Sequence, residues 1–322
     1  MQLIEVNSLV GEDLIKVEES IRSVSKVGYP WLAEMLGHTI AGGGKRVRPA
    51  LCLLCGKLYE YDFKRLVLMA TSVELLHTAT LVHDDAIDKS PVRRGRSTVN
   101  QLWGEEKAVL LGDYLFAKAG EFSASTENIR VVKLFAQTLE IISKGELNQA
   151  FNAFNLKQNH EDYIQRIADK TASLFVLSTE SGAVLSHAPE KSVQALKEYG
   201  YNLGVAFQIV DDILDFTSTE KELGKPIGSD LAQGTFTLPA MLLVEHYPGD
   251  NPVKRLFESR GERKENIGRA IETVRNSTIV EECYKFATAF SVKACSQLDS
   301  LPDCPARQAL KELAEYVVSR QS

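Results

Sequence analysis

The chain has 322 residues, of which 44% are apolar, so it is long enough to bury a large core and has the composition of a globular protein. Its formal net charge of −6 argues against a nucleic-acid-binding protein. The negative net charge does not exclude the binding of phosphorylated ligands, because local basic groups or divalent cations can reverse the sign of an acidic pocket. The chain has 5 cysteines, and an odd number spread over a large chain is typical of a protein whose thiols stay reduced.

Long amphipathic segments follow one another along the chain, and few stretches show the alternation of a strand. The predicted helices cover residues 3–26, 31–38, 61–89, 105–121, 128–154, 161–182 and 191–216, with shorter ones beyond residue 236. No linker rich in Pro, Gly or Ser divides them, so we expect an all-α fold in one domain, residues 1–322. Charges interrupt every apolar run, and residues 1–14 lack the pattern of a signal peptide. We therefore expect a cytoplasmic protein without a membrane span.

Two acidic runs of the form D-D-x-x-D end two of the predicted helices. The first consists of Asp84, Asp85 and Asp88, and the second of Asp211, Asp212 and Asp215. In a helix, the first and last aspartate of each run point about 40° apart. Three carboxylates in an otherwise apolar helix are unfavourable unless they are paired or bind metal. Magnesium, which is held by one or two carboxylates plus substrate phosphates, fits such runs.

Basic and glycine-rich segments accompany both runs. Gly42-Gly43-Gly44-Lys45-Arg46 is followed by Val47-Arg48-Pro49, and it is not a Walker P-loop because Arg46 stands where Ser or Thr is required. Three arginines follow the first run directly, in Arg93-Arg94-Gly95-Arg96. The polar segment 217–234, which follows the second run, has the glycines and length of a lid. Cys52-x-x-Cys55 lacks a second close pair, so we expect core cysteines rather than half of a zinc site.

In this order the segments resemble the trans-isoprenyl diphosphate synthases of the polyprenyl synthase type, over almost the whole chain. The matching segments are residues 43–49, 77–94, 169–172, 204–215 and 224–230. The resemblance implies a large helical bundle of the isoprenoid synthase type with a central active-site cavity. It also implies head-to-tail condensation of isopentenyl diphosphate with an allylic diphosphate. In this reaction, loss of diphosphate leaves an allylic carbocation that the double bond of isopentenyl diphosphate attacks.

The resemblance assigns a role to each matching position. Asp84, Asp88 and Asp211 would bind Mg²⁺ directly, three ions to a site, with Asp85, Asp212 and Asp215 as water-mediated or supporting partners. Lys45, Arg48, His77 and Arg94 would hold isopentenyl diphosphate, and Arg93, Lys170 and Lys225 the allylic diphosphate. Thr171 and Gln208 would lie near the carbocation. Many relatives have Gly-Lys where this chain has Gly234-Thr235, which removes one expected cation. Arg46 and Arg96 fall outside these roles, and we expect them to be solvated or structural.

Product length depends, in the family, on side chains before the first aspartate run. Thr80 and Ala79, four and five residues before Asp84, are small, so the resemblance implies a deep tunnel and products longer than C20. On the Asp84 face of the helix, Leu76 and Val73 come next, the latter about 16 Å away. Phe135 or Phe116, on other helices, could also floor the tunnel.

The family further implies a homodimer and allows transient membrane contact during product release. Two alternatives stay open, and two others are disfavoured. The chain could be a geranylgeranyl or farnesyl diphosphate synthase, or the catalytic subunit of a heteromeric synthase. A non-catalytic subunit would generally lose one acidic run, whereas both are present. A terpene cyclase would usually carry an Asn/Ser/Glu motif in place of the second run.

Overall fold

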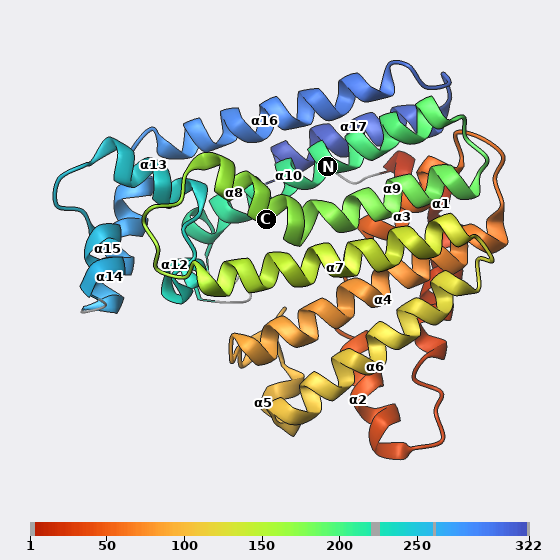
Figure 1. Cartoon of the computed structure of the whole chain (residues 1–322), viewed down its shortest axis with the longest axis horizontal. Coiled ribbons are helices and arrows are strands. Elements are labelled where there is room, and N and C mark those ends of the chain that lie inside the picture. Colours follow the sequence, from red (N-terminus) through yellow and green to blue (C-terminus); the bar gives the residue numbers. More distant parts are fainter. Residues whose placement is uncertain (1–3, 220–225, 260–261, 321–322) are drawn as a thin grey trace. The chain divides into compact units, whose positions relative to one another are not determined.

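The structure, a computed structural model, describes residues 4–219, 226–259 and 262–320. These residues form helices joined by loops, apart from the two-residue strands β1 (Val92–Arg93) and β2 (Arg96–Ser97) (Figure 1). The all-α prediction is therefore confirmed. The chain divides into two compact units, each made of three segments. We describe each unit by itself, and the expectation of a single domain stays a prediction.

Unit 1 comprises residues 1–139, 174–200 and 295–313. Its elements, apart from the two strands, are α1 (Ile4–Ser23), α2 (Pro30–Ile40), α3 (Val47–Gly56), α4 (Phe63–Ile87), α5 (Val99–Trp103), α6 (Glu105–Ala124), most of α9 (Ser173–Leu185) and parts of α7 (Ile129–Phe151), α10 (Glu190–Thr217), α16 (Ile279–Leu298) and α17 (Pro305–Ser319).

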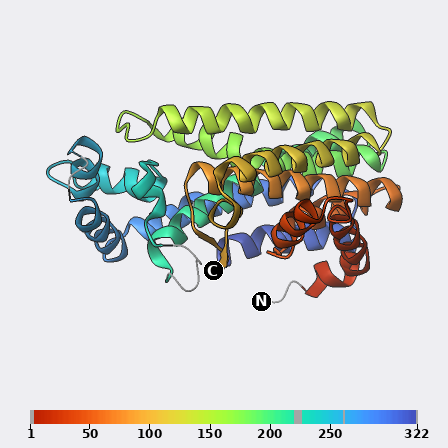
Figure 2. The same cartoon turned by 90° about the horizontal axis from the view of Figure 1, so that it is seen from below.

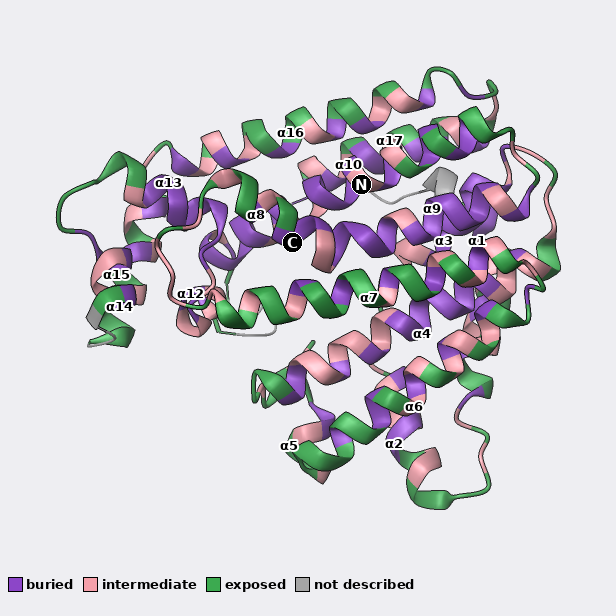
Figure 3. Cartoon of the chain, in the orientation of Figure 1, coloured by how far each residue is buried: buried purple, intermediate pink, exposed green. Residues whose placement is uncertain are grey.

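Helix α4 is the core helix of unit 1. Asp62 begins it by accepting a hydrogen bond from the backbone N–H of Arg65 at 3.1 Å, and neither Gly nor Pro interrupts it. It lies alongside α6 in Figures 1 and 2, and α1 and α3 also contact it. Residues 69–76, in the middle of α4, are buried on all sides of the helix, because it has several neighbours there. Figure 3 shows partly buried and exposed residues toward the end of the helix.

Among the described helices, α4 alone is long and apolar enough to cross a membrane by length and composition. In the structure, 61% of its most apolar window is buried inside the protein. It also carries a buried glutamate, Glu74, that is ion-paired. We therefore interpret α4 as a core helix rather than as a membrane span.

Helices α3 and α9 approach each other closely in unit 1. A Cβ atom at Gly182 would lie 2.4 Å from the carbonyl oxygen of Cys52, so only glycine allows this approach. Cys52 and Cys55 are both fully buried at this point. The prediction of core cysteines is thus confirmed.

Unit 2 comprises residues 140–173, 201–294 and 314–322. Besides its parts of α7, α10, α16 and α17, it contains α8 (His160–Ile167), a π-helical turn η1 (Ala168–Ala172), α12 (Ser229–Gln233), α13 (Leu238–His246), α14 (Pro252–Ser259) and α15 (Arg263–Arg275).

Two boundaries in unit 2 differ from the sequence prediction. The predicted helix 161–182 is interrupted by η1. The interruption was not predicted, because a π-helical turn leaves no mark in hydrophobic periodicity. The predicted loop 217–234 contains the short helix α12, which begins and ends at glycines in the left-handed conformation, Gly228 and Gly234. Residues 220–225 of this loop, including Lys225, lie outside the described residues.

Candidate active site

The first acidic run ends α4 in unit 1. Asp84 is half-buried and Asp88 is exposed, whereas Asp85 is buried. Arg93, in β1, donates from Nε to both carboxylate oxygens of Asp85, at 2.8 and 2.9 Å. Burial raises the pKa of Asp85, and the charges of Asp84 and Asp88 raise it further, while Arg93 opposes both effects. Asp85 therefore anchors Arg93, and its supporting role in metal binding stays a prediction.

A short hairpin presents the arginines that follow this run. In the β1–β2 pair, Val92 lies opposite Ser97 and Arg93 opposite Arg96. Arg94 and Gly95 make the turn with φ of 51° and 73°. The hairpin turns the chain back toward α4, so cations and carboxylates that adjoin in sequence also adjoin in space.

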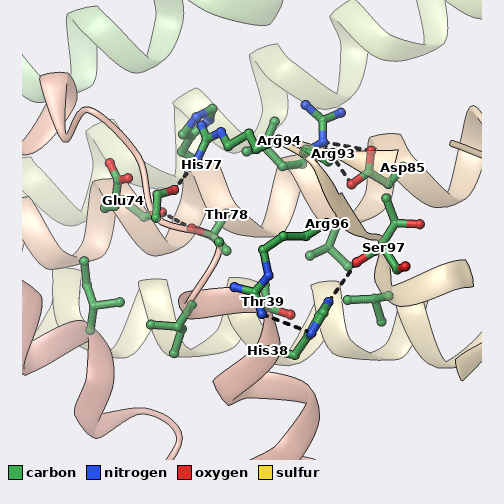
Figure 4. Close-up of a pocket in the computed structure, with 18 of the residues that line it drawn as sticks. His38, Thr39, Glu74, His77, Thr78, Asp85, Arg93, Arg94, Arg96 and Ser97 are labelled. Carbon is green, nitrogen blue, oxygen red and sulfur yellow. Dashed lines mark hydrogen bonds and ion pairs between the residues drawn. The ribbon is translucent and has the colours of Figure 1, made fainter. Parts of the chain in front are cut away.

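A pocket lies between α2, α4 and this hairpin, all within unit 1 (Figure 4). The pocket is partly open to solvent. Its charged and histidine lining residues are His38, Arg46, Glu74, His77, Asp85, Arg93, Arg94 and Arg96. Four arginines against two carboxylates make the wall cationic, which suits an anion such as a diphosphate.

His77 lies in this wall as a neutral imidazole. Burial lowers its pKa well below the usual value, and the positive charges of Arg48, Arg94, Arg93 and Arg46 lower it further. A neutral imidazole offers one N–H donor and one acceptor. Two of these arginines, Arg48 and Arg94, are assigned with His77 to isopentenyl diphosphate by the family resemblance, whereas Arg93 is assigned to the allylic diphosphate.

Two further predicted residues flank the same region without lining the pocket. Arg48, in the first turn of α3, places its guanidinium 4.9 Å from the ring centre of Phe175. Lys45 is exposed in the loop before α3. The structure therefore brings His77, Arg93 and Arg94 into one pocket, and the charge of Arg48 acts on His77 although Arg48 does not line the pocket.

The second acidic run belongs to α10, in unit 2, and its middle aspartate is held by a hydrogen-bond chain. Thr171 donates to Gln208 at 2.6 Å, Gln208 donates to Asp212 at 2.8 Å, and the hydroxyl of Tyr163 donates to Asp212 at 2.8 Å. Burial raises the pKa of Asp212 to about 7, and the charge of Asp230 raises it as well. The sequence predicted that Thr171 and Gln208 share a site, and the structure bonds them to each other.

The flanking aspartates of this run contact other parts of unit 2. Asp215 is buried and accepts hydrogen bonds from Ser229 Oγ at 3.0 Å and from the N–H of Asp230 at 3.2 Å, so it holds the start of α12. Asp211 is partly exposed and accepts a hydrogen bond from Arg320. The same guanidinium lies 3.9 Å from the ring centre of Phe207 and donates to the carbonyl of Phe207.

Lys170 lies in the π-helical turn η1. Its Nζ is 2.7 Å from Glu146 of α7. Gly145 lets the two elements approach, because a Cβ atom there would lie 2.9 Å from Cβ of Asp169. A π-helical turn is frequent at functional sites, since it re-aims side chains that a regular helix would point elsewhere.

Sequence reasoning missed several residues around these sites. They are Glu74 in unit 1, and Glu146, Tyr163, Arg166 and Arg320 in unit 2. Arg166 is buried and donates to the carbonyl of Phe236 at 2.7 Å and to Gln158 at 2.7 Å. A polar residue inside a helical apolar face is the only signal that could have pointed to Glu74 or Arg166.

The side chains fit divalent cations by their chemistry. Each run offers carboxylate oxygens, the ligands that Mg²⁺ prefers. In the first run, repulsion of Asp85 by Asp84 and Asp88 favours a cation beside them. Within the part of the chain that the structure describes, no group of three or more His, Cys, Asp or Glu side chains encloses a metal site. Mg²⁺ keeps several waters and takes ligands from substrate phosphates, so a complete protein cage is not expected.

The residues predicted to control product length lie in the interior of unit 1. Val73, Leu76 and Ala79 are fully buried in α4, and Thr80 is partly buried. Phe116 makes an edge contact with His83, with ring centres 5.0 Å apart, and Phe135 packs against Gly120 of α6. The role of all these residues in product length stays a prediction.

Comparison with known proteins agrees with this geometry. Residues 29–274 match the family model of polyprenyl synthetase. Component 2 of heptaprenyl diphosphate synthase from Geobacillus stearothermophilus is 37% identical, over 99% of both chains. The crystal structure of a Caulobacter crescentus polyprenyl synthase complexed with calcium and isoprenyl diphosphate superposes with a TM-score of 0.95 at 32% identity, covering 100% of this chain and 98% of the other. A decaprenyl diphosphate synthase from Rhodobacter capsulatus gives 0.91 at 37% identity, covering 99% of both chains. This chain therefore belongs to the polyprenyl synthetase family, the trans-isoprenyl diphosphate synthases.

Proposed function

We propose that this chain condenses isopentenyl diphosphate repeatedly with an allylic diphosphate, in the presence of Mg²⁺, to give an all-trans polyprenyl diphosphate longer than C20. The observation that carries the proposal is the cationic pocket that adjoins the first aspartate run within unit 1. Support for the long product comes from similar proteins that are named heptaprenyl and decaprenyl diphosphate synthases.

In this proposal, the chain's own residues bind and orient the two substrates. Arg94, His77 and their neighbours hold the isopentenyl diphosphate, and Arg93, fixed by Asp85, faces the allylic diphosphate. Mg²⁺, when bound at the aspartate runs, would neutralise the leaving diphosphate. The Thr171–Gln208 pair offers oxygen atoms that stabilise positive charge on the allyl group. The attack by isopentenyl diphosphate then joins the two chains, and loss of a proton restores a double bond.

A product assay tests the proposal directly. The purified chain is incubated alone with farnesyl diphosphate, labelled isopentenyl diphosphate and Mg²⁺, and the products are sized. We expect labelled products longer than C20, and none from a matched Asp84→Ala sample. Products that stop at farnesyl or geranylgeranyl diphosphate would contradict the long-chain proposal and favour a short-chain synthase.

A second candidate is the catalytic subunit of a heteromeric synthase. It is favoured by the name "component 2" of two relatives, from Geobacillus stearothermophilus and Bacillus subtilis, at 37% and 36% identity. The same assay distinguishes a synthase that acts alone from a catalytic subunit, because elongation by the chain alone would mean that no second component is required. Absence of elongation by a folded chain would favour the heteromeric enzyme.

We also propose a homodimer in the cytoplasm. In unit 1, Leu102 of α5 and Val109 and Leu110 of α6 are 49%, 41% and 60% exposed, an apolar group that a second copy could cover. Light scattering after size-exclusion chromatography should give twice the mass of the chain. The variant Leu110→Asp should give a monomer, and a dimer that persists in this variant would place the interface elsewhere.

A further inference from the structure

We propose that Glu74 and Arg46 are positioning residues for isopentenyl diphosphate, and that their ion pair holds the cations of the pocket together before the substrate arrives. The inference rests on the proposed function, because it assigns these two residues to the substrate site described above. It concerns two side chains that line the same pocket and belong to neither predicted set of substrate-binding residues.

The ion pair joins three elements of unit 1. Arg46, which precedes α3, has its Nη1 2.6 Å from Glu74 Oε1 in α4 and its Nη2 2.9 Å from Glu18 Oε2 in α1. The side chains of Arg46 and Glu74 are only 17% and 6% exposed. Removing one partner of such a buried pair is costly, because it leaves the other charge buried without compensation.

Arg46 also has an uncommon backbone conformation. Its φ is 50°, in the left-handed region, and it stands directly before the first turn of α3. This conformation is unfavourable for a residue with a side chain, so it persists where surrounding contacts hold it. The ion pair with Glu74 is one such contact. It acts at a position that lies in sequence between Lys45 and Arg48, two of the predicted diphosphate ligands.

Glu74 also lies where two arginines meet. A Cβ atom at Gly44 would lie 3.1 Å from Arg94 Nη1, 3.4 Å from Arg46 Nη1 and 3.6 Å from Glu74 Oε1. Arg94 donates to the carbonyl of Gly43 in the same loop. Two guanidinium groups so close repel each other, and the Glu74 carboxylate supplies the nearest negative charge within this cluster.

The position of Glu74 along α4 connects it to the substrate side of the pocket. It precedes His77 by one helical turn, and its backbone carbonyl accepts the hydroxyl of Thr78 at 2.8 Å. Figure 4 shows Glu74, His77 and Thr78 along one wall of the pocket. Loss of the Glu74 charge should therefore displace Arg94 and the 42–46 loop, and weaken the binding of a diphosphate that needs them in place.

The test is a comparison of Michaelis constants in Glu74→Gln and Arg46→Lys. We expect KM for isopentenyl diphosphate to rise at least about 10-fold in Glu74→Gln, since the loss of one charge-assisted contact is worth about 1.4 kcal/mol or more. KM for the allylic diphosphate should change less than about threefold. KM for isopentenyl diphosphate should rise less in Arg46→Lys than in Glu74→Gln, because lysine keeps the positive charge. In the double variant the two rises should be less than additive, because Glu74 and Arg46 act through one ion pair.

Glu180→Gln is the matched control. Glu180 is also a buried glutamate of unit 1, with Arg130 at 3.5 Å and Lys197 at 3.9 Å, but it does not line the pocket. It should lower stability without moving either KM. An equal rise of both KM values in Glu74→Gln, or a change below twofold in KM for isopentenyl diphosphate, would overturn the inference.

Two further measurements keep the test decisive. If Glu74→Gln does not fold, Glu18→Gln replaces it, because it removes the other partner of Arg46 and should raise the same KM about threefold. An unchanged KM in that variant would overturn the inference. If the wild-type chain does not turn over, the proposed function fails separately. Calorimetric titration with inorganic diphosphate then decides: binding about 10-fold weaker in Glu74→Gln supports the inference, and equal binding overturns it.

Discussion

Gly145→Ala should damage the site of Lys170 and Thr171 through packing alone. In unit 2, α7 and the π-helical turn η1 approach each other at Gly145. The new Cβ atom would lie 2.9 Å from Cβ of Asp169 and 3.4 Å from the backbone nitrogen of Lys170. Carbon atoms in contact normally lie about 3.5–4.0 Å apart. The neighbours are a backbone atom and a Cβ atom, which cannot rotate away, so η1 itself has to move.

The size of the effect follows from two opposing terms. Overpacking of a buried contact typically costs about 1–3 kcal/mol. Replacing glycine by alanine inside a helix returns about 0.8–1 kcal/mol. We therefore expect a net loss of stability of up to about 2 kcal/mol. We also expect turnover to fall roughly 10- to 100-fold, because displacement of η1 moves Lys170 and Thr171 together.

Gly268→Ala is the matched control in the same unit. Gly268 lies inside α15, is exposed, and has no atom within 4 Å of the position of a new Cβ. It should stabilise the protein by about 0.4–1 kcal/mol and leave turnover unchanged. Urea unfolding and steady-state kinetics measure both variants. If Gly145→Ala is as stable as Gly268→Ala and fully active, the close approach of α7 to η1 does not determine the geometry of the site.

Three other predictions follow from the site. Asp84→Ala or Asp211→Ala should lower turnover by at least about 100-fold with an unchanged helical circular dichroism spectrum, since each removes a carboxylate that would hold Mg²⁺; near-normal rates would remove that residue from the mechanism. Thr80→Tyr should shorten the products in the sizing assay, because Thr80 is the partly buried small residue one turn before Asp84; an unchanged product distribution would place the tunnel floor elsewhere. The pKa of His77 is lowered in the folded chain, so as pH falls below about 6.5 the imidazole is protonated in the unfolded chain before it is protonated in the folded one. The wild type should therefore lose stability below about pH 6.5 relative to His77→Asn. A difference in unfolding free energy that stays constant between about pH 8 and 5 would contradict the shifted pKa.

Hydrophobic periodicity was sufficient to predict an all-α chain, and most helix boundaries follow from it. The predicted helix 61–89 is α4, Phe63–Ile87, and the predicted helix 191–216 is α10, Glu190–Thr217. Periodicity reports only which face of a helix is apolar. It therefore could not reveal the π-helical turn at 168–172, where the apolar pattern continues while the hydrogen bonding changes.

The candidate site was predictable where its residues are close together in sequence. Asp85 and Arg93 are 8 residues apart, on either side of a short turn, and the structure joins them at 2.8 Å. Contacts between residues far apart in sequence were predictable only where both residues matched motifs of the family, as with Thr171 and Gln208. Tyr163 and Asp212 are 49 residues apart, and Asp211 and Arg320 are 109 apart. Neither Tyr163 nor Arg320 belongs to a recognisable motif.

The sequence by itself determined the helical fold class, the family and the two carboxylate runs. The fold class and the runs depend on residue types at short spacing within a helix, and the family on short motifs that keep their order along the chain. Only the tertiary structure decided which partner each charged group has. Arg46 is the clearest case: the sequence places it between two cations, whereas the fold buries it against Glu74 and Glu18 from two other helices. Burial and the identity of the nearest charge depend on how distant segments pack, and no local pattern encodes that packing.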